Sequence, residues 1–164
     1  MWEKINKQSD ILFHNCLEKK LTVTTAESCT GGMIASSIVS VSGSSAIFKS
    51  SVVTYSNEMK SKILNIPLKS INKNGAVSKV IAYTMAFNVL DLMNSDISIA
   101  VTGIAGPGGG SKNKPVGLVY IGIGTKQNIV TKRYLFKGNR LKVRQETTLE
   151  ALKLSNKIIE TFNS

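Results

Sequence analysis

The chain has 164 residues, 42% of them hydrophobic and 19% charged, with a formal net charge of +11. This size and composition are typical of one compact domain, and the lack of any run of about 18 apolar residues excludes a membrane-spanning segment. Charged residues among the first ten positions exclude an apolar signal core there, so we expect a single domain, residues 1–164, located in the cytoplasm.

The first third of the sequence alternates between helix-like and strand-like patterns. Apolar residues at helical spacing predict helices over 5–20 and 33–39, the first of them packed on a sheet. Short β-branched runs predict strands over 21–26 and 51–55. The Ser- and Gly-rich residues 42–45 should end the second helix.

Two further helices are predicted from their capping residues. Asn57 is placed to cap a helix over 57–64, and Ser78 is placed to cap a long helix that extends to residue 94. The apolar face that this long helix should bury comprises Val80, Ile81, Met85, Val89 and Leu92.

The rest of the chain predicts a buried strand, a loop, a hairpin and a closing helix. In chain order these cover residues 97–101, 103–115, 116–136 and 141–162, with a turn at 125–127 inside the hairpin. Helices that alternate with strands, followed by a hairpin, indicate an α/β fold. We expect a three-layer α/β/α sandwich with a mixed central sheet.

Ligands of such open sheets gather beyond the carboxyl ends of the strands, where residues 27–32 follow the first predicted strand. Ser28 and Thr30 could project there toward helix-terminal N–H groups, or they could be helix caps. Cys29 is a rival nucleophile. The single histidine, His14, lies on a separate amphipathic helix, so neither a Cys–His pair nor a metal site is predicted.

A second segment, residues 55–60, follows the next predicted strand. Lys60 falls in the first turn of its helix, where the helix dipole and any burial would lower the pKa of the amine. A neutral amine can take a proton from a serine hydroxyl. The alternative is a solvated surface lysine, as neighbouring Lys62 would be.

A third segment, residues 102–110, is a glycine-rich loop after an apolar strand. Its bare backbone could approach a phosphate, a ribose or a ring closely, or the loop could simply be flexible. It matches neither the Walker pattern nor the dinucleotide-binding pattern, so no nucleotide cofactor is predicted.

Six short blocks, in this order and spacing, resemble the C-terminal domain of the CinA family. They are residues 26–32 (AESCTGG), 41–46 (VSGSSA), 53–57 (VTYSN), 75–78 (GAVS), 102–107 (TGIAGP) and 114–117 (KPVG). The resemblance extends over residues 5–162 and implies a stand-alone form of that domain. Two positions depart from the family pattern: Lys49-Ser50-Ser51, where glycines are common, and Asn139, where an aspartate is usual.

The resemblance implies an amidase, free of metal and cofactor, that converts nicotinamide mononucleotide to nicotinate mononucleotide and ammonia. Its Ser/Lys dyad corresponds to Ser28 as the nucleophile and Lys60 as the general base, with Tyr55 relaying a proton or orienting the lysine. Backbone N–H groups near Thr30 and Gly31 would stabilise the oxyanion. The other substrate-binding residues that it implies are Ser45, Thr102, Gly103, Arg140 and Arg144.

The two arginines would donate to the nucleotide phosphate, or they could be solvated residues at the start of the last helix. The expected partner is thus a small pyridine nucleotide, and the resemblance also implies a homo-oligomer. The alternative is a non-enzymatic nucleotide- or nucleic-acid-binding protein, motivated by the charge of +11 and by the family's association with competence and DNA damage. Most of the cations are scattered along the chain, so nucleic acid is not the expected partner.

Overall fold

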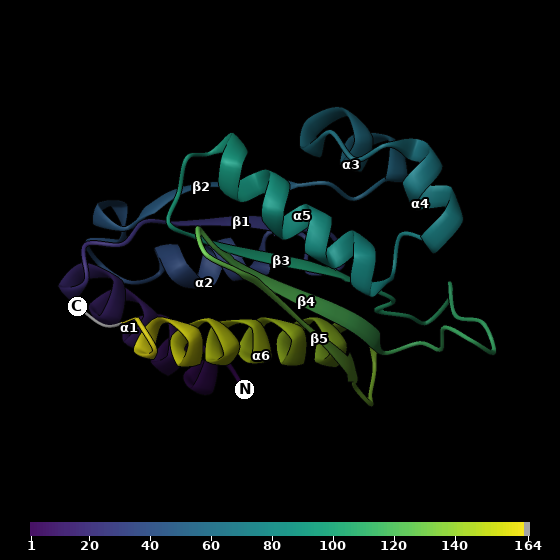
Figure 1. Cartoon of the computed structure of the whole chain (residues 1–164). Coiled ribbons are helices and arrows are strands. Elements are labelled where there is room, and N and C mark those ends of the chain that lie inside the picture. Colours follow the sequence, from purple (N-terminus) through teal and green to yellow (C-terminus); the bar gives the residue numbers. More distant parts are fainter. Residues whose placement is uncertain (163–164) are drawn as a thin grey trace.

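The computed structural model describes residues 1–162 of the chain. In that part, one sheet lies between two layers of helices (Figure 1). The helices are α1 (Trp2–Glu18), α2 (Met33–Val39), α3 (Asn57–Leu64), α4 (Leu68–Asn74), α5 (Lys79–Leu92) and α6 (Arg140–Glu160), with a 3-10 helix, η1 (Ser44–Ala46). The strands are β1 (Val23–Glu27), β2 (Phe48–Val53), β3 (Ile97–Gly103), β4 (Leu118–Thr125) and β5 (Ile129–Leu135).

The sheet is mixed, with the strand order β2-β1-β3-β4-β5. β1 pairs in parallel with β2 and β3, whereas β4 is antiparallel to β3 and β5 is antiparallel to β4. The central strands β1 and β3 are buried almost throughout, because helices cover both of their faces. The carboxyl ends of the three parallel strands therefore meet at one edge of the sheet.

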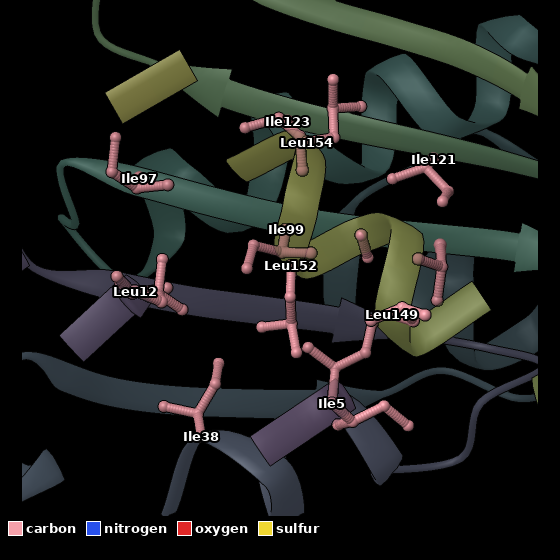
Figure 2. Packing of buried hydrophobic residues seen from close by; sticks show 14 of the residues in the cluster. Ile5, Leu12, Ile38, Ile97, Ile99, Ile121, Ile123, Leu149, Leu152 and Leu154 are labelled. Carbon is pink, nitrogen blue, oxygen red and sulfur yellow. The ribbon is translucent and has the colours of Figure 1, made fainter. Parts of the chain in front are cut away.

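Two helical layers complete the sandwich. On one face, α1, α2 and α6 enclose the larger core, in which Ile5, Ile99 and Leu152 pack together (Figure 2). On the other face, α5 crosses the sheet, with α3 and α4 beside it, around a second core that includes Met85. The predicted three-layer α/β/α fold is confirmed. None of the described helices has the length and apolar character needed to cross a membrane.

Helix α5 packs unusually close to the sheet. A Cβ atom at Gly122 on β4 would lie 2.6 Å from the carbonyl oxygen of Ala82, so only glycine fits there. The predicted buried positions Ile81, Met85 and Val89 are confirmed, but Val80 and Leu92 are about half exposed. The prediction was wrong for these two because α5 is apolar on more sides than the sheet can cover.

Two local predictions also differ from the structure. The cap of α3 is Ser56, whose Oγ accepts the Met59 N–H at 3.1 Å, and not its neighbour Asn57. Helix α4 was not predicted, since its sequence LKSINKN shows no apolar periodicity and buries only Ile71. From the sequence, Pro67 is expected only to lie beyond the end of the helix over 57–64, whereas in the structure it also precedes the first residue of α4.

Candidate active site

Ser28 is the first residue after β1, at the edge where the parallel strands end. Its backbone N–H still donates to the Val101 carbonyl oxygen on β3 at 3.1 Å, so the central sheet fixes its position. The chain then turns through Gly31 and Gly32 with φ of +60° and +91°, a left-handed conformation that favours glycine. This turn leaves the Ser28 side chain at the sheet edge, 7% exposed.

Lys60 lies in the first turn of α3, and its side chain reaches back to the end of β1. Its Nζ is 3.0 Å from Ser28 Oγ and 2.7 Å from the Thr54 carbonyl oxygen. The side chain is only 1% exposed. This burial lowers the pKa of the Lys60 amine from 10.5 to about 8. The structure thus brings the predicted serine and lysine into hydrogen-bond contact, and Lys60 is not a solvated lysine.

A cavity of about 250 Å³ opens beside this pair. Its walls come from the segment before α3, the turn before α5 and the glycine-rich loop after β3. Of the residues predicted to form the site, those that line it are Ser28, Tyr55, Lys60, Thr102, Gly103 and Arg140. The three segments predicted from the carboxyl ends of the strands therefore share one cavity.

Thr102 and Gly103 form the back wall of the cavity. The Thr102 hydroxyl donates to the Ala76 carbonyl oxygen at 2.8 Å, which ties the end of β3 to the turn before α5. A Cβ atom at Gly103 would lie 2.9 Å from the Leu118 carbonyl oxygen and 3.1 Å from Cys29 Sγ. The absence of a side chain at Gly103 therefore lets β3 pack directly against the turn that carries Ser28.

Arg140, at the start of α6, links two walls of the cavity at its rim. Its Nη1 donates to the Gly106 carbonyl oxygen at 2.8 Å, and its Nη2 donates to Tyr55 Oη at 2.6 Å. Both side chains are exposed, that of Tyr55 by 60%. Tyr55 therefore contacts Arg140, whereas Lys60 is held by Ser28 and Thr54.

The N-terminus of α2 holds a buried carboxylate that the sequence analysis did not single out. Glu27, at the end of β1, is fully buried. Its oxygens accept hydrogen bonds from the N–H groups of Gly32, Ile34 and Ala35 and from the Thr30 hydroxyl. The helix-terminal N–H groups that we expected to face a ligand are therefore occupied by Glu27. A glutamate inside a buried strand, just before a Gly-Gly turn, is the signal that could have indicated this role.

We predict that Glu27→Gln will lower the free energy of unfolding by about 2 kcal/mol or more. The amide keeps the size of the side chain but replaces one acceptor oxygen by an NH₂ donor that faces other donors. Urea unfolding of the two proteins measures the difference. Glu3→Gln, on the exposed side of α1, is the matched control and should change stability little. Equal stability of all three proteins would contradict this account of Glu27.

The rival nucleophile and the histidine do not form a pair. Burial raises the pKa of the Cys29 thiol to about 12, which keeps it protonated and a poor nucleophile although it lines the cavity. His14 is exposed on α1 with its ring against Phe13, and it does not line the cavity. Among residues 1–162, no group of three or more His, Cys, Asp or Glu side chains is placed to hold a metal ion.

Three predicted site residues do not reach the cavity with their side chains. Ser45 lies in η1 before β2, whose first residue pairs with Val23, so it is roughly 16 Å from Ser28 along the strand direction. The Thr30 hydroxyl is buried against Glu27. Arg144 donates through Nε and Nη2 to the Thr30 carbonyl oxygen, at 3.2 and 2.7 Å. None of these three residues lines the cavity beside Ser28 and Lys60.

The two departures from the family pattern have structural explanations. Ser50 and Ser51 lie within β2, where their hydroxyls bond to Thr24 and Thr25 on β1, away from the cavity. Asn139 caps α6 by accepting the Lys142 N–H at 2.9 Å, a role that asparagine and aspartate fill about equally well. Neither departure removes a group that lines the cavity.

These features define an α/β protein with a buried serine–lysine pair at the carboxyl edge of a mixed sheet. The model of the CinA C-terminal domain matches residues 5–159. The chain therefore belongs to the CinA family. It is 52% identical over 138 residues to a CinA-like protein of Endomicrobium trichonymphae, covering 84% of this chain and 32% of that protein. With a CinA-like protein of Prochlorococcus marinus (strain MIT 9515) the identity is 50% over 136 residues, covering 82% of this chain and 31% of that one.

Solved structures of the family share this fold over almost the whole chain. The competence/damage inducible protein CihA from Agrobacterium tumefaciens superposes with a TM-score of 0.93 at 34% identity, covering 96% of each chain. Competence damage-inducible protein A from Klebsiella pneumoniae subsp. pneumoniae MGH 78578 gives a TM-score of 0.94 at 29% identity, covering 97% of this chain and 99% of that one. The chain spans about a third of the length of the curated relatives it matches.

Proposed function

We propose that the protein is an amidohydrolase that deamidates nicotinamide mononucleotide to nicotinate mononucleotide and ammonia without a metal ion. The observation that carries this proposal is the 3.0 Å contact between Lys60 Nζ and Ser28 Oγ. An amine of lowered pKa can take the proton of a hydroxyl that it contacts at the wall of a cavity, and the hydroxyl oxygen can then attack an amide. The choice of substrate rests on membership in the CinA family.

The proposed reaction has two halves. Neutral Lys60 takes the proton of Ser28 as Oγ attacks the carboxamide carbon, and then gives that proton to the departing nitrogen, which leaves as ammonia. The product remains as an ester on Ser28. Water attacks the ester carbon, its proton passes to Lys60 and then to Oγ, and the carboxylate is released with Ser28 restored. Lys60 thus ends each cycle in the neutral form.

The oxyanion of the tetrahedral intermediate needs N–H donors close to Ser28. The Gly31 N–H donates to the Ser28 carbonyl oxygen at 3.1 Å, so it is already used inside the turn. We therefore shift the proposed oxyanion donor from the N–H groups near Thr30 and Gly31 to the backbone N–H of Cys29, the residue directly after the nucleophile.

The charged end of the substrate would lie at the rim of the cavity. Arg140 is exposed there and presents a planar fork of donors that suits a phosphate. Its present acceptors, the Gly106 carbonyl oxygen and Tyr55 Oη, are neutral groups that a phosphate can replace. The net charge of +11 would draw such an anion toward the protein.

The direct test is ammonia release from nicotinamide mononucleotide by the purified protein in the presence of a chelator. We expect turnover that the chelator does not change. Nicotinamide riboside, which lacks the phosphate, is the matched control substrate and should react with a higher KM. An absence of ammonia release, with the protein shown to be folded by circular dichroism, would contradict the proposal.

The pH dependence of the reaction should follow Lys60. Only the neutral amine can accept the serine proton, and its pKa of about 8 predicts a kcat/KM that rises with pH until it levels off above that value. Below the pKa, the loss should be about tenfold per pH unit, because the neutral fraction of Lys60 falls by that factor. Initial rates between pH 6 and 9.5 measure this, and a rate that falls over that interval would contradict the role of Lys60.

A further inference from the structure

The outer side of α5 carries a ridge of exposed side chains at a spacing of four residues. The ridge comprises Lys79, Tyr83, Phe87 and Asp91, all of them exposed. Tyr83 and Phe87 are 45% and 54% exposed, and their rings stack on each other with centroids 6.5 Å apart. Large aromatic side chains side by side on a surface are typical of an interface. In Figure 1, α5 is the outermost element over this part of the sheet.

The ridge is complementary to itself. It begins with a cation and ends with an anion, and the two aromatic residues lie at equal distances from its midpoint. If two copies of α5 cross in opposite directions about a two-fold axis, one register places Lys79 opposite Asp91 of the second copy. The same register places Tyr83 opposite Phe87 of the second copy. In the commonest class of helix packing, the rows of side chains four residues apart on the two helices interdigitate.

We propose that this face of α5 is the surface through which two copies of the chain associate. Two further observations point to a second copy. A groove of about 350 Å³ runs between the end of α5 and the β4–β5 turn, lined by Phe87 and Leu90 among others. The register that pairs the charges also places half-exposed Val80 of the second copy opposite Leu90. One two-fold arrangement therefore fills the groove, pairs the charges and covers the aromatic rings on both copies.

The interface also adjoins the candidate active site. Ala76 and Val77, which line the cavity, precede the ridge by only a few residues. The second copy would thus pack beside the cavity wall that the turn before α5 provides. The proposed association does not rest on the proposed amidase activity, since none of the ridge residues lines the cavity.

The first experiment measures association by analytical ultracentrifugation over a range of protein concentrations at physiological salt, where the net charge is screened. We expect the wild-type chain to be dimeric, and Phe87→Glu to raise the dissociation constant by about 100-fold or more, since each dimer carries the substitution twice. Val39→Glu, an equally exposed apolar position on α2, is the control and should remain dimeric. A monomeric wild-type chain, or a dimer unaffected by Phe87→Glu, would overturn the proposal.

A charge exchange tests the antiparallel register itself. Asp91→Lys places two lysines opposite each other at both ends of the interface and should weaken association by about tenfold or more. Adding Lys79→Asp in the same chain restores opposite charges, so the double variant should regain most of the lost affinity. Failure of the double variant to recover, with circular dichroism unchanged, would overturn this pairing of the two helices.

Discussion

Replacing Ser28 by alanine should reduce ammonia release from nicotinamide mononucleotide by about 10⁶-fold, the loss typical for removal of a serine nucleophile. The substitution removes the hydroxyl that Lys60 Nζ contacts just after β1, so no covalent intermediate can form. The fold should persist, since the change is small and the Ser28 backbone remains bonded to Val101. Initial rates measured with a coupled ammonia assay give the ratio.

The matched control for this change is Ser37→Ala. Ser37 is also buried, at 3% exposed, but lies on α2 and donates to the Ile34 carbonyl oxygen away from the cavity. It should keep nearly full activity, and both variants should unfold at similar urea concentrations. If Ser28→Ala remains as active as Ser37→Ala, Ser28 is not the nucleophile.

Lys60→Met should have opposite effects on activity and stability. Activity should fall by about 10³-fold or more, because Lys60 is the one side chain among residues 1–162 that bonds to Ser28 Oγ. The free energy of unfolding at pH 7 should rise by about 1 to 3 kcal/mol. The upper figure is the cost of burying a protonated amine whose pKa falls from 10.5 to about 8, and the lower figure allows for two lost hydrogen bonds.

The gain in stability should itself depend on pH. Between pH 8 and 10.5 the unfolded chain binds more protons at Lys60 than the folded protein, so the stability of the wild type rises with pH across this interval. Lys60→Met lacks this dependence, and its advantage should shrink as pH increases. Lys62→Met, on the exposed side of the same helix, is the control. A Lys60→Met protein less stable than wild type at pH 7 would contradict the claim that the buried Lys60 amine destabilises the folded protein.

Much of the fold could be predicted because periodicity and capping are local. The helix over residues 33–39 and the cap at Ser78 agree with the structure, since short runs of side chains determine both. Helix α4 was missed because it is mostly polar and buries only Ile71, so its sequence has no apolar periodicity. The order of the strands depends on contacts between distant segments and could not be derived from any window of the sequence.

The candidate site was predictable in its central pair and less so in its surroundings. Ser28 and Lys60 both follow strands, and parallel strands end at a common edge, so topology alone brings them near. Ser45 belongs to a block that resembles a site in sequence but precedes β2, which puts it near the amino end of that strand, away from Ser28. The role of Glu27 was hidden for another reason: a buried carboxylate at a helix N-terminus is recognisable only once its donors are placed.

In the proposed mechanism, the groups that would react and the groups that would select the substrate come from different parts of the chain. Ser28 and Lys60 belong to the first 60 residues, whereas the glycine-rich loop and Arg140 supply many of the other residues that line the cavity. Changes in residues 104–109 would reshape the space for the amide without moving the pair that exchanges the proton. A library randomised at those six positions is therefore the natural starting point for evolving a catalyst that accepts other carboxamides.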